Sequence, residues 1–105
     1  MDVGPLGRFA DPAVLILSSL AESDRHGYAL IKDIEAFAGV KLGAGTLYSA
    51  LAKLEQAGLV EALPADERRR PYQITAAGRE FLYQRLTESA RIAEVGLQRI
   101  AVASS

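Results

Sequence analysis

The sequence of 105 residues predicts one small, mainly α-helical domain that carries a β-hairpin and ends in a long helix. Three observations support this fold class. Apolar residues recur with helical spacing over residues 13–54, short runs rich in strand formers follow over residues 59–75, and helical spacing returns up to residue 102.

Two short helices are predicted before residue 40. The first begins at Asp11, whose carboxylate suits an N-cap, and Pro12 suits the first helical position. The apolar stripe of this helix continues to Ala21. The second helix is predicted over residues 27–38, where Gly39 suits the position just after the helix end.

The third helix, predicted over residues 44–56, has an ordinary buried side and an unusual exposed side. Leu47, Leu51 and Leu54 form one apolar stripe. No acidic residue occurs over residues 36–54, although the whole chain holds 13 acidic and 12 basic residues. A helix that meets only water usually mixes acidic and basic side chains on its exposed arc. The exposed arc is therefore predicted to meet a partner.

A β-hairpin is predicted after the third helix, with Gly58 closing that helix. The runs LVEAL (59–63) and PYQIT (71–75) are short and rich in strand formers. The connection between them is predicted to be a long, exposed tip with the charged sequence ADERRR. A second window without acidic residues, 68–79, begins in this tip.

Thr75 is predicted to cap a final helix over residues 76–102, about 40 Å long at 1.5 Å per residue. So small a body cannot cover a helix of that length, and the apolar stripe continues beyond the body. A second copy of the chain is the simplest cover for such a stripe. The sequence therefore predicts a homodimer whose interface is formed by Leu82, Leu86, Ala93, Leu97 and Ile100.

This order of elements predicts a winged helix-turn-helix: three helices, a two-stranded wing and a long C-terminal dimerisation helix. The predicted division is a flexible N-terminal segment at 1–10, a winged helix-turn-helix DNA-binding domain at 11–75, and a C-terminal dimerisation helix and tail at 76–105. In this fold the third helix enters the major groove. A face with small side chains and no acids suits a groove lined by phosphates.

The predicted DNA contacts carry hydroxyl or basic groups. They are Tyr28, Lys41, Thr46, Tyr48, Ser49, Lys53, Arg68, Arg69 and Arg70. Hydroxyl groups can bind phosphates or base edges, and basic side chains neutralise phosphates. Taken singly, each residue also has a structural interpretation: the two tyrosines can pack in the core, and the arginines can solvate a hairpin tip. The net charge of −1 argues against a nucleic-acid partner, whereas the segregation of charge along the chain argues for one.

The composition argues against several other classes of function. The chain has no cysteine, and its single histidine, His26, is predicted to have a structural role at the start of the second helix. No nucleophile with a histidine base and no phosphate-binding glycine loop is recognisable. We therefore expect a non-enzyme without cofactor or metal. Without a membrane-spanning stretch or a secretory signal, it is expected in the cytoplasm.

Four segments, ILSSL, HGYALIKDIE, GAGTLYSALAKLEQAGLVE and RRPYQITAAGREFL, resemble the PadR family of bacterial transcriptional regulators. They occur in the family's order and spacing over residues 13–82. The resemblance implies a winged-helix domain, a dimer formed through the C-terminal helix, and repression of a nearby promoter that a ligand relieves. The single C-terminal helix resembles the family's short subgroup. Gly43-Ala44 stands where the family often has Ser-Pro, which weakens the helix cap.

The resemblance also implies a site for an effector. In short members of the family, a ligand can lie at the dimer interface between aromatic side chains. This chain has no tryptophan, so a site for a small aromatic effector would depend on residues such as Phe9, Phe81 or Tyr83.

Two classes of function stay open from the sequence. The first is a dimeric repressor that binds a pseudo-palindromic operator in double-stranded DNA. The second is a winged-helix protein-interaction module that does not bind DNA, which the slightly acidic net charge favours. A ligand-binding scaffold with an aromatic dimer cleft is a third, weaker candidate.

Overall fold

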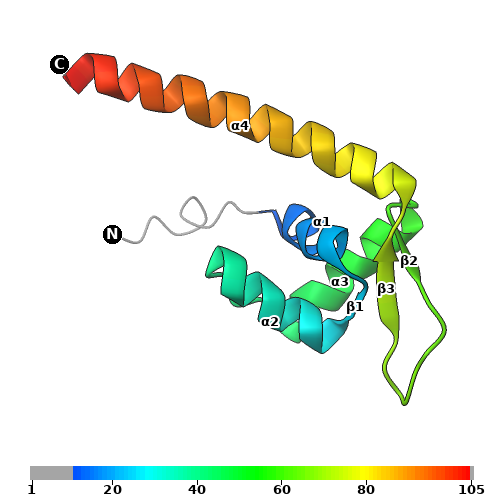
Figure 1. Ribbon diagram of the computed structural model, residues 1–105. Helices are drawn as coiled ribbons and strands as arrows, with labels where there is room; N and C mark the ends of the chain where they lie inside the picture. Colours follow the sequence, from blue (N-terminus) through cyan, green and yellow to red (C-terminus); the bar gives the residue numbers. More distant parts are fainter. Residues whose placement is uncertain (1–10, 105) are drawn as a thin grey trace.

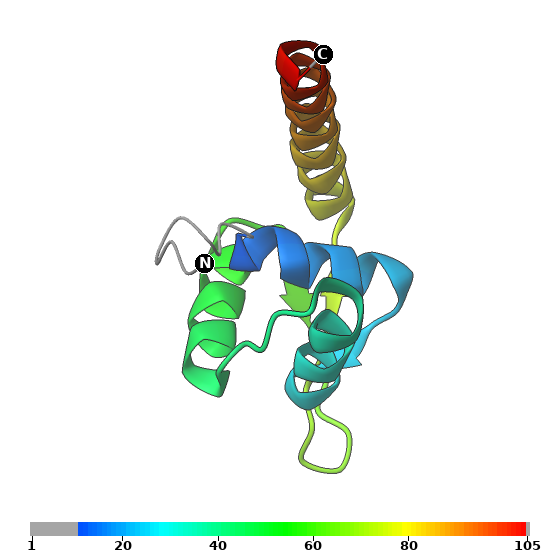
Figure 2. The ribbon, with the colours of Figure 1, turned by 90° about the vertical axis from the view of Figure 1, so that its left-hand side faces the viewer.

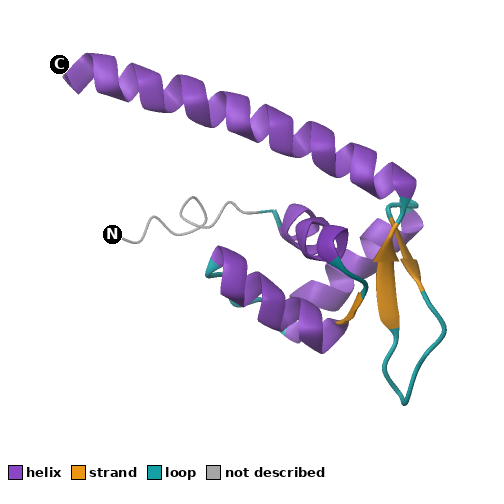
Figure 3. Ribbon diagram, viewed as in Figure 1, coloured by secondary structure: helices purple, strands orange, loops and turns teal. Residues whose placement is uncertain are grey.

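The computed structural model describes residues 11–104 and is mainly helical (Figure 3). The elements are α1 (Pro12–Glu22), β1 (Arg25–His26), α2 (Gly27–Ala38), α3 (Ala44–Gln56), β2 (Val60–Ala62), β3 (Pro71–Ile74) and α4 (Ala76–Ser104) (Figure 1). This arrangement confirms the predicted fold class, because three helices, a β wing and a long final helix occur in the predicted order. The predicted N-terminal segment 1–10, including Phe9, lies outside the described residues.

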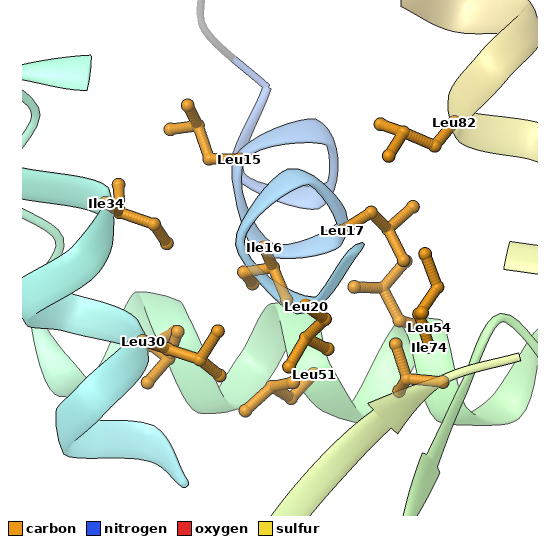
Figure 4. Packing of buried hydrophobic residues seen from close by; sticks show 12 residues of the cluster. Leu15, Ile16, Leu17, Leu20, Leu30, Ile34, Leu51, Leu54, Ile74 and Leu82 are labelled. Carbon is orange, nitrogen blue, oxygen red and sulfur yellow. The ribbon is translucent and has the colours of Figure 1, made fainter. Parts of the chain in front are cut away.

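Helix α1 lies at the centre of the domain. Three of its consecutive residues, Leu15, Ile16 and Leu17, are all buried. Consecutive apolar residues point to different sides of a helix, so α1 must be covered from several directions. Helices α2, α3 and α4 and strand β3 provide this cover, and Figure 4 shows their side chains converging on α1.

The helix ends follow the predicted capping residues. The Asp11 side chain accepts a hydrogen bond from the backbone N–H of Ala13 at 2.9 Å. Gly39 ends α2 with a φ of 68°, a left-handed conformation that glycine adopts without steric cost. Gly43 precedes α3 without a side-chain cap, as its lack of a side chain dictates. The Thr75 hydroxyl accepts a hydrogen bond from the N–H of Gly78 at 3.0 Å and thereby caps α4.

A small polar network joins α1, β1 and α2. The hydroxyl of Ser19, which is buried, donates to a carboxylate oxygen of Asp33 at 2.6 Å. The Arg25 Nε–H donates to the same hydroxyl oxygen at 3.0 Å and lies 3.5 Å from Asp33. The buried hydroxyl thus both donates and accepts a hydrogen bond, which offsets the cost of removing it from water.

The sheet has one more strand than the sequence analysis predicted. Its antiparallel order is β1-β3-β2, so the wing is completed by two residues that precede α2. Arg25 pairs with Tyr72, and His26 pairs with Pro71. The prediction of a two-stranded wing was incomplete because two residues are too few to show the alternation of a strand. Only the approach of β3 makes them pair.

Helix α4 has 29 residues, which corresponds to about 44 Å at 1.5 Å per residue. Its first turns pack on α1, and the rest projects from the body (Figure 2). The molecule accordingly measures 58 × 30 × 21 Å. Leu82, which was predicted at the dimer interface, is only 6% exposed and belongs to the core of its own chain. Helix α1 therefore packs against α4 as far along as Leu82.

Replacing Gly78 with alanine is expected to destabilise the fold. A Cβ at this position would overlap the carbonyl oxygen of Leu59 and lie 2.8 Å from Cγ1 of Ile74. Because one obstacle is backbone, the chain must shift, and we expect the free energy of unfolding to fall by about 1–3 kcal/mol. Urea denaturation measures this change.

Gly45→Ala in α3 is the matched control for that substitution. Nothing lies within 4 Å of a Cβ built on Gly45, so alanine should stabilise this helix by up to about 1 kcal/mol. Equal unfolding midpoints for the two variants would contradict the close contact at Gly78.

Candidate nucleic-acid interface

The exposed arc of α3 is arranged as the sequence predicted. Leu47, Leu51 and Leu54 are buried. Thr46, Tyr48, Ser49, Ala52 and Lys53 are all exposed, and the first acidic residue of the helix is Glu55 in its last turn. The arc carries hydroxyl groups, small side chains and one cation over most of the length of α3.

Side chains on the two edges of this arc line two separate clefts. The first, the α1–α3 cleft, has a volume of about 470 Å³ and is lined by Asp11, Ala13, Gly45, Thr46, Ser49, Ala50, Lys53 and Leu54. Asp11 is the acidic residue of this cleft, and its carboxylate forms an ion pair with Arg85 of α4 at 3.2 Å. This pairing offsets the negative charge beside Lys53.

The second cleft, the tyrosine cleft, brings together the start of α2, the other edge of α3 and the wing. It has a volume of about 270 Å³ and is lined by His26, Gly27, Tyr28, Tyr48, Arg68, Arg69, Arg70 and Tyr72. Tyr28 is 65% exposed and Tyr48 is 51% exposed, so neither is a core residue. Both tyrosines are therefore surface residues and do not pack in the core. Their rings line the same cleft as the three arginines of the wing.

The position of the Tyr48 ring depends on Gly27. A Cβ on residue 27 would overlap the Tyr48 hydroxyl oxygen and lie 2.7 Å from Tyr48 Cζ. The missing side chain therefore leaves the space in which the ring lies against the start of α2. Glycine at this position therefore allows Tyr48 of α3 to lie against the start of α2, where Tyr28 lines the same cleft.

Tyr72 forms the wall of the tyrosine cleft on β3. Burial raises the pKa of its phenol, as do the negative charges that Glu55 and Tyr48 can carry, while Arg70 acts in the opposite direction. The phenol of Tyr72 is therefore protonated at neutral pH and available as a hydrogen-bond donor.

The wing tip is a tight turn with an uncommon backbone. The backbone groups of Asp66 and Arg69 exchange hydrogen bonds of 2.7 and 2.8 Å. Between them, Glu67 and Arg68 have φ values of 47° and 74°. Positive φ at both central residues is typical of type I′ turns, which normally contain asparagine or glycine. The turn leaves Arg68, Arg69 and Arg70 exposed beside the tyrosine cleft.

Some exposed residues were missed by the sequence analysis. At 100° per residue, Gly45, Ser49 and Gln56 lie most directly opposite the leucine stripe, yet only Ser49 was included among the predicted contacts. Helical periodicity alone could have added Gly45 and Gln56. The predicted contact Lys41 is exposed in the connection between α2 and α3.

Within residues 11–104, no three histidine, aspartate or glutamate side chains are grouped so that they could hold a metal ion. Among the helices described, none is both long enough and apolar enough to cross a membrane.

Comparison with known proteins identifies relatives. Residues 16–84 match the profile of the transcriptional regulator PadR-like family. A 37.1 kDa protein in transposon TN4556 of Streptomyces fradiae is 44% identical over 85 residues, which are 81% of this chain and 25% of that protein. The chain thus spans about a quarter of this relative's length.

Two solved structures resemble the whole fold. A PadR family transcription regulator from Clostridium difficile is 29% identical, with a TM-score of 0.77 over 85% of this chain and 97% of that chain. A transcriptional regulator from Clostridium thermocellum is 30% identical, also with a TM-score of 0.77, over 90% of this chain and 94% of that chain.

Replacing Gly27 with alanine should destabilise the protein through Tyr48. In a Tyr48→Ala background the overlap is gone, so the same substitution should cost nothing. A double-mutant cycle measured by urea denaturation should give a coupling of about 0.5–3 kcal/mol between the two positions. Tyr83→Ala is the control background, because Tyr83 lies on α4 and is 66% exposed. Equal costs in all backgrounds would contradict the packing.

Proposed function

The chain belongs to the transcriptional regulator PadR-like family, and from this premise we propose that it is a dimeric, sequence-specific DNA-binding repressor. In this proposal residues 11–75 bind DNA and residues 76–105 form the dimerisation segment. Within that segment, the part of α4 beyond its first turns, which pack on α1, contacts the partner. The family consists of transcriptional regulators, which are not enzymes.

One observation carries the proposed DNA binding. The acid-free face of α3 and the exposed arginines of the wing border the same cleft, although more than ten residues separate them in sequence. In the proposed complex, α3 lies in the major groove, where Thr46 and Ser49 contact base edges or phosphates. Tyr28, Tyr48, Lys41, Lys53 and the wing arginines contact phosphates.

Exposed apolar side chains on α4 support the proposed homodimer. Of the predicted interface residues, Leu86 is 44% exposed, Leu97 is 68% exposed and Ile100 is 65% exposed, while Ala93 is also exposed. Four more large apolar residues of α4 are exposed as well: Tyr83, Ile92, Val95 and Val102. A second copy would cover this surface and place two α3 helices at half-sites about 34 Å apart on a pseudo-palindromic operator.

We also propose that a small aromatic molecule relieves repression at this interface. Tyr83 of α4 is 66% exposed. Phe81 is half-buried, and the Arg85 guanidinium lies 5.3 Å from the centre of its ring. Phe81 packs against the core of its own chain, whereas Tyr83 lies close to Leu86 around α4 and gives a flat ligand a stacking partner beside the proposed dimer surface.

A protein-interaction module without DNA binding is the alternative that the net charge of −1 favours. In that case a partner protein would cover the α3 arc. Nonspecific DNA affinity would then be as weak as expected for an acidic protein.

The test of DNA binding is a fluorescence-anisotropy titration with duplex DNA from immediately upstream of the gene. Wild type should prefer this duplex over a scrambled one by on the order of a thousandfold. Lys53→Ala should weaken binding to every duplex and flatten the salt slope by about one ion. Lys53→Arg, which keeps the charge, is the control and should retain the slope.

The outcomes separate the proposals. Equal, feeble binding of wild type to both duplexes would favour the protein-interaction module. Unchanged salt dependence in Lys53→Ala would remove that residue from the phosphates. Release of bound DNA by a flat aromatic compound would support the effector.

The dimer interface can be tested with a charge on α4. Leu97→Glu should convert the dimer to a monomer in sedimentation velocity, because it would bury a carboxylate in an apolar interface. Gln98→Glu, one residue along but on a different side of the helix, should remain dimeric. A dimeric Leu97→Glu protein would exclude this stripe as the interface.

A further inference from the structure

His26 lies where β1, α2 and the wing meet. It pairs with Pro71 of β3, directly precedes α2, and lines the tyrosine cleft. It also lines a second cleft beside the wing, the acidic cleft, of about 390 Å³. The lining residues of the acidic cleft are Asp24, Arg25, His26, Ala29, Asp66, Glu67, Arg69 and Pro71. His26 and Arg69 belong to both clefts.

The two ring nitrogens of His26 face two hydrogen-bond donors. Nδ1 lies 3.3 Å from the backbone nitrogen of Ala29, whose N–H it caps. Nε2 lies 3.3 Å from Nη1 of Arg69. A neutral imidazole has one accepting nitrogen, because the other carries the proton. The neutral ring can therefore accept from one of these donors at a time, and the protonated ring can accept from neither.

Protonation of His26 would change what surrounds it. An imidazolium repels the Arg69 guanidinium and is unfavourable at the N-terminus of α2. The carboxylates of Asp24, Asp66 and Glu67 in the acidic cleft are the groups to which it could donate. The other cation of this cleft, Arg25, already contacts carboxylates of Glu22 and Asp33 at 3.5 Å.

We propose that His26 is a positioning residue for Arg69. In the neutral tautomer whose Nε2 accepts, the ring holds the guanidinium at the boundary between the two clefts, and the charged ring displaces the guanidinium into the tyrosine cleft. There Arg69 joins Arg68 and Arg70 and adds a phosphate contact. This inference rests on the proposed DNA binding, and it makes affinity for DNA rise as the pH falls.

The single histidine makes the effect measurable. Histidine side chains change charge between about pH 5 and 8, and His26 is the only one in the chain. Lowering the pH from about 8 to about 5.5 should tighten wild-type binding to the operator duplex by at least about threefold and steepen the salt slope by about one ion. Both titrations are done at constant ionic strength by fluorescence anisotropy.

Two variants separate positioning from a merely structural role. In His26→Asn the side-chain oxygen can still cap α2 but does not titrate, so affinity should be the same at both pH values. In Arg69→Gln the histidine is kept, but the change in salt slope should disappear. A pH dependence that persists in His26→Asn would overturn the proposal.

A measurement on the free protein makes the inference independent of DNA. The NMR signal of Arg69 Nε should move with pH together with the His26 ring signals in wild type and stay fixed in His26→Asn. A stationary Arg69 signal in wild type would overturn the coupling. Failure to bind DNA at any pH would instead contradict the proposed function, and binding without pH dependence would contradict only this inference.

Discussion

Burial of α1 on several sides is the constraint on which the domain depends. Leu15, Ile16 and Leu17 follow one another and are all buried, so α2, α3, α4 and β3 must pack around one helix of 11 residues. Burial of each such side chain contributes about 1.5–3 kcal/mol. Because α3 and β3 both contact α1, the packing on α1 sets the angle between α3 and the wing. The relative placement of the two parts of the proposed DNA interface, α3 and the wing, therefore depends on how both pack against α1.

The wing is tied to the helices by a second, polar constraint. The network of Ser19, Arg25 and Asp33 holds β1 against α1 and α2. β1 in turn pairs with β3, which fixes the register of the wing. A shift of that register by one residue would turn Tyr72 from one face of the sheet to the other. The tyrosine cleft thus depends on this two-residue pairing together with the pairing of β2 with β3, in which Ala62 lies opposite Tyr72.

The sequence predicted those parts of the fold that local chemistry determines. Asp11, Gly39 and Thr75 act at helix ends as their side chains or backbone freedom require, and α3 has the predicted bounds. What the sequence could not show depends on three-dimensional approach. β1 forms only because β3 lies beside it, and Leu82 is buried only because α1 reaches the start of α4. Likewise, helical spacing places Tyr48 and Lys53 on one exposed arc but cannot reveal that they line different clefts.

The start of α4 is joined to the turn that follows α3. The Thr75 hydroxyl donates to the carbonyl of Gly58 at 2.7 Å, its N–H donates to the carbonyl of Leu59 at 3.1 Å, and Gly78 packs against Leu59. In the proposed dimer, the near end of α4 is therefore fixed to the turn that follows α3, and its far end meets the partner. A ligand that changed how two α4 helices cross would change the separation of two α3 helices. In the proposed repressor, such a change would relieve repression without any contact between the ligand and α3.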